Sequence, residues 1–182
     1  MATVDYFLKI DGIDGESQDD KYKNQIHIES FSWGVSNMGA SAAGGGSGAG
    51  KALFHDLFVI KEVDAASPKL MEACASGKHI GSAILHCRKA GGSQQEYYTI
   101  TLTDVLISGY QTSGHPVGRR THAANVTTSR SNTQHNGVAP VPVETVSINF
   151  SKIQFDYKEQ DSKGNVGGPV SAGYDLKANK PS

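Results

Sequence analysis

The sequence has few cysteines, no excess of charge of either sign and no long apolar segment. Its two cysteines, Cys74 and Cys87, are too few for a disulfide framework or a zinc site, so we expect buried thiols in a reducing compartment. The formal net charge of -1 argues against a generic nucleic-acid or anionic-membrane partner. No apolar run approaches the ~20 residues of a bilayer-spanning helix. Residues 1–5 also lack the basic start of a signal peptide. We therefore expect no membrane insertion and, if the protein is exported, no use of the general secretory route.

Catalytic motifs are missing as well. There is no G-x-S-x-G elbow, because Gly48 is followed by Ala49. His55 and Asp56 are neighbours on a predicted strand, where their side chains point to opposite faces. The acidic run at residues 11–20 lacks the order of a calcium loop. The sequence predicts no enzyme, no cofactor and no metal site.

One near match to a nucleotide motif lies at residues 45–51, where Gly45, Gly50 and Lys51 satisfy most of the phosphate-loop pattern. The hydroxyl residue that would hold magnesium is replaced by Ala52. The residues that follow read as a strand, whereas the motif needs a helix N-terminus directed at the phosphates. A glycine loop is the favoured interpretation, and a nucleotide-hydrolysing protein is kept as a third hypothesis.

A single helix is predicted at residues 67–77. Ser67 fits an N-cap, Pro68 the first helical position and Gly77 the C-terminal end. Leu70, Met71 and Cys74 form an apolar stripe that suits packing on a sheet.

The remaining regular structure is β. Hydrophobic periodicity predicts strands at residues 3–10, 25–35, 53–63, 82–89, 96–110 and 142–157. The apolar phase changes near Glu29 and again near Ser151, which predicts two bulges. Residues 53–63 are apolar on both faces and are predicted to be a buried central strand. Thr99, Thr101 and Thr103 share one polar face. We expect a mainly β fold, a small β-barrel of two antiparallel sheets with one short flanking helix.

The chain is predicted to be a single domain of residues 1–182, with three segments outside its predicted strands and helix. Residues 37–50 are a glycine-rich loop, and residues 158–182 are a polar tail. Residues 112–139 contain no acidic residue and carry Arg119, Arg120 and Arg130 among three histidines. Such a long loop is unusual in a compact domain. It is interpreted as a polar insertion without contacts, as a contact surface for a partner or cargo, or as a metal site.

Several segments together resemble the haemolysin-coregulated protein (Hcp) family, the tube subunit of the bacterial type VI secretion system. They occur in order along nearly the whole chain. They are Val4–Ile13 with Gly15-Glu16-Ser17, Ile28–Gly34, Gly50-Lys51, Ala66–Met71, Ala75–Ile80, Arg88–Gly91, Glu96-Tyr97, Leu102–Val105, Pro142-Val143-Glu144 and Tyr174–Asn179.

The resemblance implies a homohexameric ring whose copies stack into a hollow tube. It implies sheath, baseplate and spike proteins as partners and effector proteins in the lumen. It also implies a protein that is made in the bacterial cytoplasm and is then secreted by the type VI route. The family's stacking loop maps onto Asn37, Gly44, Gly45, Gly46, Gly48 and Gly50. The threonine face is then expected to line a lumen or an interface.

The chain departs from this pattern at residues 112–139, where the family has a much shorter connection. Arg119, Arg120 and Arg130 are the candidate partner or cargo contacts there. A monomeric β-barrel module that binds an effector or ligand through this insertion is the second hypothesis.

Overall fold

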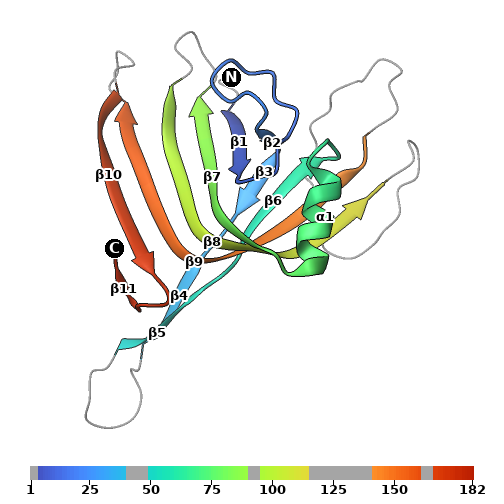
Figure 1. Cartoon of the computed structure of the whole chain (residues 1–182). Coiled ribbons are helices and arrows are strands. Elements are labelled where there is room, and N and C mark those ends of the chain that lie inside the picture. Colours follow the sequence, from blue (N-terminus) through green and yellow to red (C-terminus); the bar gives the residue numbers. More distant parts are fainter. Residues whose placement is uncertain (1–3, 40–48, 90–94, 115–140, 161–165) are drawn as a thin grey trace, which may run out of the picture.

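The computed structural model describes residues 4–39, 49–89, 95–114, 141–160 and 166–182. Eleven strands and one helix follow one another in it (Figure 1). They are β1 (Val4–Ile10), β2 (Ile26–Ile28), β3 (Ser30–Ser32), β4 (Val35–Gly39), β5 (Ala49–Phe54), β6 (Leu57–Glu62), α1 (Ser67–Ser76), β7 (His79–Lys89), β8 (Glu96–Ser113), β9 (Val143–Gln160), β10 (Val166–Asp175) and β11 (Lys180–Pro181).

The predicted mainly β fold with one helix is confirmed, and every strand pair is antiparallel. Nine strands form one sheet in the order β11-β10-β9-β8-β7-β1-β2, with β6 joining β9 to β3, and β4-β5 form a second sheet. The expected barrel is not closed. The predicted strand is interrupted at Glu29 and divides into β2 and β3. β2 pairs with β1, while β3 pairs with β6. This break lies where the change of apolar phase predicted a bulge.

The neighbouring strands β7, β8 and β9 bend together next to Asp104 of β8. On β9 this bend coincides with the change of apolar phase predicted near Ser151. On β8 the buried side chains are Ile100 and Leu102 before the bend and Val105 and Ile107 after it. Asp104 lies between them with a φ of 53°, a left-handed conformation that non-glycine residues seldom adopt. Because this residue reverses the alternation, the long strand presents apolar side chains to the core on both sides of the bend.

The helix differs from its prediction in two details. It ends at Gly77 with a φ of 63°, as expected of a glycine C-cap. Ser67 is not the N-cap, because Ala66 precedes the helix and Ser67 is itself a buried helical residue. The buried stripe is Leu70 and Ala73, whereas Met71 is 50% exposed. Cys74 is partly buried against the core, so the stripe differs from the prediction mainly at Met71.

Two strand predictions are corrected. The segment 53–63 is not one buried strand, since His55 and Asp56 separate β5 from β6 and the side chains of Leu53 and Phe58 are 61% and 42% exposed. The tail also continues the sheet, because β10 pairs with β9 from Val166 to Asp175. Its glycines and exposed residues gave no apolar alternation from which a strand could be predicted.

Candidate assembly surfaces

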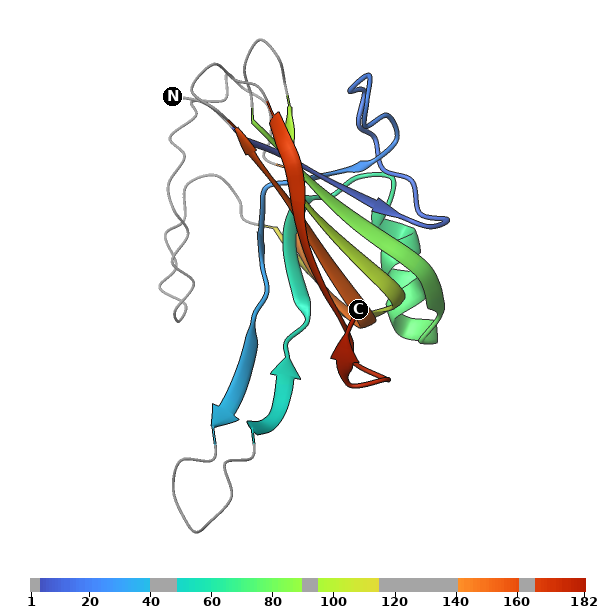
Figure 2. The same ribbon diagram turned by 90° about the vertical axis from the view of Figure 1, so that its left-hand side faces the viewer.

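The β4-β5 hairpin projects from the body of the molecule as a two-stranded arm (Figure 2). Its strands pair from Val35 opposite Phe54 to Gly39 opposite Ala49. The arm is joined to the body by the stacked rings of Phe54 and Tyr174, whose centroids are 5.1 Å apart. Two-stranded hairpins are marginally stable alone in water, so an arm of this length is expected to gain stability from a further contact.

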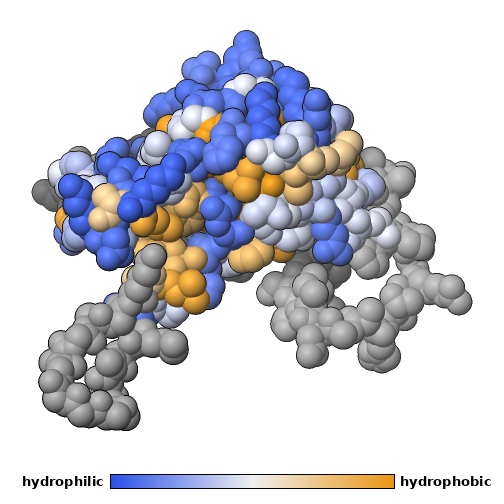
Figure 3. Space-filling model, turned by 60° about the horizontal axis from the view of Figure 1, so that its bottom comes forward, coloured by the Kyte–Doolittle hydropathy of each residue, from blue (hydrophilic) through white to orange (hydrophobic). Residues whose placement is uncertain are grey.

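Both faces of the arm carry exposed apolar side chains. Val35 is 50% exposed and shares a face with Phe54, while Leu53 is 61% exposed and lies on the opposite face with Ser36. The end view shows apolar surface where the arm leaves the body (Figure 3). Exposed apolar surface of this kind is typical of an interface.

The predicted stacking residues lie partly on this arm. Asn37 is exposed on β4 opposite Ala52, and Gly50 lies in β5. The predicted loop is thus partly strand, and Gly50 and Lys51 begin a strand rather than a phosphate-binding helix. Gly44, Gly45, Gly46 and Gly48 lie outside the described residues.

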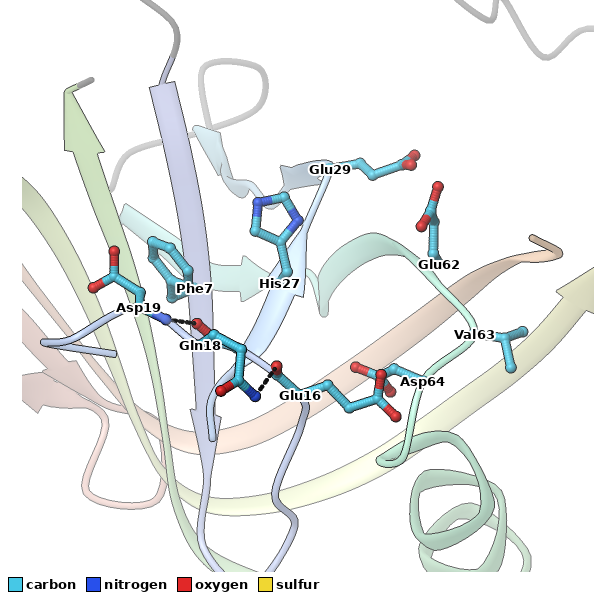
Figure 4. Close-up of a pocket in the computed structure, with 10 residues that line it drawn as sticks. Phe7, Glu16, Gln18, Asp19, His27, Glu29, Glu62, Val63 and Asp64 are labelled. Atoms are coloured by element: carbon cyan, nitrogen blue, oxygen red, sulfur yellow. Dashed lines mark hydrogen bonds between the residues drawn. The ribbon is translucent and has the colours of Figure 1, made fainter. Parts of the chain in front are cut away.

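A groove of about 560 Å³ lies at the other end of the molecule, between the loop after β1 and the end of β6 (Figure 4). Five carboxylates and His27 line it, with Phe7 and Val63. The carboxylates belong to Glu16, Asp19, Glu29, Glu62 and Asp64.

Three of these carboxylates already have partners. Glu16 accepts a hydrogen bond from the Ala65 N–H at 3.1 Å. Asp19 is 2.7 Å from Arg88 Nη1, and Asp64 is 2.8 Å from Lys61 Nζ. The side chains of Glu29 and Glu62 make no hydrogen bond or ion pair with the part of the chain that the structure describes. They are therefore the two carboxylates of the groove without a hydrogen-bond or ion-pair partner among the described residues.

An aromatic and charged cluster fastens the wall of the groove to the sheet. The rings of Phe7 and Tyr22 stack at 4.7 Å, and Arg88 lies 5.0 Å above the Phe7 ring. Tyr22 Oη donates to Glu96 at 3.1 Å, and His86 Nδ1 lies 2.6 Å from the same oxygen. The hydrogen bond with His86 is the main reason that the pKa of Glu96 is lowered to about 2. Phe7 of β1 is buried beneath this loop.

A buried ion pair lies beneath the other wall. Lys61 is fully buried and its Nζ is 2.9 Å from Glu144 Oε2, which also accepts from Ser67 Oγ at 2.8 Å. Tyr110 Oη donates to the other oxygen of Glu144. Burial alone would raise the pKa of Glu144, but the hydrogen bonds from Lys61, Tyr110 and Ser67 lower it.

Sequence reasoning missed this ion pair, although the sequence contained a signal. Lys61 follows Leu57 and Val59 in the same strand phase, and Glu144 precedes Val146 and Ile148 in theirs. A charged residue in phase with an apolar face is expected to be buried with a partner.

A smaller exposed cluster surrounds Asp104 at the bend. Its Oδ1 is 2.8 Å from His79 Nδ1, and its Oδ2 accepts from Ser151 Oγ at 2.8 Å and from Lys177 Nζ. These hydrogen bonds, with that from Lys177 the strongest, lower the pKa of Asp104. The cluster ties the segment after β10 to the bend.

The predicted threonine face is on the side of the sheet away from the core. Thr99, Thr101 and Thr103 are partly or fully exposed. Their partners in register on β9 are polar, namely Asp156, Gln154 and Lys152, whereas those on β7 are His86, Ile84 and Ser82. Leu106 is only half-buried because the bend shifts the phase of the buried positions on β8.

The three arginines of the insertion, Arg119, Arg120 and Arg130, lie outside the described residues. Its base is described, since Ser113 pairs with Val143 and the Val63 N–H donates to Pro142 O at 2.9 Å. The described ranges contain no group of three or more metal-ligating side chains. Nor do they contain a helix that is long and apolar enough to cross a membrane.

Comparison with known proteins assigns the chain to a family. Residues 7–157 match the family model described as type VI secretion system effector, Hcp. Protein hcp1 of Pseudomonas aeruginosa is 39% identical over 178 residues, which are 97% of each chain. The chain belongs to the Hcp family.

Solved structures agree with this assignment. Hcp1 from Salmonella typhimurium is 37% identical and has a TM-score of 0.68, with complete coverage of both chains. A structure described as a type six secretion system protein has a TM-score of 0.82 at 29% identity, covering 99% of this chain and 100% of its own. The chain is therefore a type VI secretion protein with the fold of Hcp proteins, as the resemblance predicted.

Proposed function

We propose that this Hcp protein is a structural subunit of the secretion tube. Copies close into six-membered rings, and the rings stack into a hollow tube that delivers effector proteins. The observation that carries the proposal is the projecting arm, whose apolar side chains on both faces have too little of their own body to pack against. Because the chain belongs to the Hcp family, the partner proposed for the arm is another copy of the same chain.

The polar sheet face supports a lumen. Threonine, serine, glutamine and charged side chains make up most of it across three strands, with Ile84 among them, and a mainly polar surface suits a water-filled channel wall. In this proposal the protein is made in the cytoplasm, carries effectors in the lumen, and contacts sheath, baseplate and spike proteins during export. It acts by assembly and cargo contact, with no catalytic step.

Mass measurement tests the assembly. Light scattering coupled to size exclusion is expected to give six times the chain mass of 19.3 kDa, and negative-stain images are expected to show closed rings. A strictly monomeric species at high concentration would overturn the proposal and favour a monomeric effector-binding module.

A further inference from the structure

The acidic groove lies where two strands of the sheet part. β3 pairs with β6 as far as Ser30 opposite Ile60. In the same register Ile28 of β2 would oppose Glu62 of β6, but among the described strands β2 is paired with β1 alone. The end of β6 is held by β9 instead, with Glu62 opposite Val143. One edge of β2 therefore has no ladder partner in the part of the chain that the structure describes.

An open strand edge of this kind can bind an extended peptide. The backbone N–H and C=O groups along such an edge pair with an added strand. β2 contributes His27 to the lining of the groove, so a segment that adds to β2 would lie along the groove. Its volume of about 560 Å³ is that of a small-ligand site, so it takes a few residues of a chain rather than a folded domain.

The charge of the groove selects a basic segment. The side chains of Glu29 and Glu62 are exposed, have no hydrogen-bond or ion-pair partner among the described residues, and point toward each other in Figure 4. None of the residues that line the groove is a lysine or an arginine. Two neighbouring carboxylates repel one another, and a lysine or arginine side chain placed beside both relieves that repulsion.

The groove also offers apolar contact. The Phe7 ring forms part of its lining, with the His27 ring edge-on to it at 5.6 Å, and Val63 is 37% exposed. Successive side chains of an extended segment point to opposite faces. Basic residues can therefore face the carboxylates while the apolar residues between them cover Val63 and remove apolar surface from water.

We propose that the groove binds an extended segment of another protein in which basic and apolar residues alternate. The segment adds to the open edge of β2, its basic side chains meet Glu29 and Glu62, and an apolar side chain lies against Val63. All of these groups belong to one chain. The inference thus goes beyond the proposed tube subunit and does not depend on the assembly of rings.

Titration of the full-length protein with fluorescein-labelled peptides tests the charge. The peptide Lys-Val-Lys-Val-Lys is expected to bind, and Glu-Val-Glu-Val-Glu is not. The pair Glu29→Gln with Glu62→Gln is expected to weaken binding at least tenfold. A matched pair, Glu72→Gln with Glu159→Gln, removes the same charge from exposed positions on α1 and β9 and is expected to leave binding unchanged. Equal weakening by both pairs, or no binding of the basic peptide, overturns the inference.

Hydrogen exchange tests the added strand. The bound basic peptide is expected to slow amide exchange at residues 26–28, and peptides N-methylated on alternate residues are expected to bind at least tenfold more weakly. Unchanged exchange in β2, or equal binding of the methylated peptides, contradicts an added strand. Displacement of the peptide by calcium chloride, at an ionic strength at which sodium chloride leaves it bound, would identify a cation site and overturn the inference.

This inference and the proposed function fail separately. Rings of correct mass that do not bind the basic peptide contradict the groove site and leave the tube subunit standing. A monomer that binds the peptide contradicts the tube subunit alone.

Discussion

Single residues hold the loops of this protein on the sheet, and the buried Lys61–Glu144 pair is the clearest case. Both side chains are at most 1% exposed, and Asp64, 2.8 Å from Lys61 Nζ, is a second carboxylate partner of the lysine. Ser67 and Tyr110 complete the network from α1 and β8. The pair thus joins the helix to the strands that lead into the insertion.

Glu144→Gln is expected to lower the free energy of unfolding by roughly 2 kcal/mol, because it removes the charge-assisted hydrogen bonds of Glu144 and leaves Asp64 as the one carboxylate partner of the buried Lys61. Urea denaturation measures this difference. Glu72→Gln, on the exposed face of the helix, is the control and should change little. The double variant Lys61→Met with Glu144→Leu is expected to be more stable than Glu144→Gln. A stability of Glu144→Gln equal to that of the parent chain contradicts the role given to the pair.

Glu96 makes stability depend on pH. Its pKa is lowered to about 2 from an ordinary value of 4.5, chiefly by the hydrogen bond with His86. The folded state therefore favours the ionised carboxylate, and its contribution is fully present above about pH 5. It is lost as pH falls toward 2, and amounts to on the order of 2 kcal/mol for this partly buried group.

Urea unfolding of the parent chain and of Glu96→Gln at pH 6 and pH 3 measures this contribution. The parent should be the more stable at pH 6, and the difference should narrow at pH 3. A constant difference at both pH values would show that the carboxylate charge is not the cause.

At the scale of elements, the bend at Asp104 serves folding of the core, whereas the β4-β5 arm is proposed to serve assembly. The bend at Asp104 lets β7, β8 and β9 present apolar side chains to one core along their whole length. The arm contributes little to that core, since its contact with the body is mainly the Phe54–Tyr174 pair.

Leu53→Asp is accordingly expected to leave the folding stability within about 0.5 kcal/mol of the parent value, as for exposed sites in general. It should reduce stacking of rings several-fold, because it places a charge in an apolar contact. Sedimentation measures stacking and thermal unfolding measures stability. Met71→Asp, at an apolar site on α1 that is also at least half exposed, is the control and should affect neither.

At the scale of the whole molecule, residues 112–139 are predicted to be an insertion into the Hcp fold. Ser113 and Val143 are adjacent partners in the β8-β9 ladder, so the strands are close enough to be joined by a short turn.

Replacing residues 115–140 by a short Asn-Gly turn is expected to leave the ring mass and the unfolding temperature nearly unchanged. Loss of effector binding in this variant, measured by co-purification, would assign the cargo contact to the insertion. Triple substitution of Arg119, Arg120 and Arg130 by Ser tests the same point with the length retained. Binding that is equal in all three proteins would contradict a cargo role for the insertion.

The sequence by itself determined the strands with strong alternation, the helix with its Pro68 and Gly77, the two phase changes and the family. These features are local, because periodicity and capping depend on residues close together in the chain. Only the tertiary structure decided that Lys61 meets Glu144, that Phe7 lies under the loop, and that β10 extends the sheet. Each of these depends on residues far apart in sequence, whose approach is fixed by strand register and packing rather than by any local pattern.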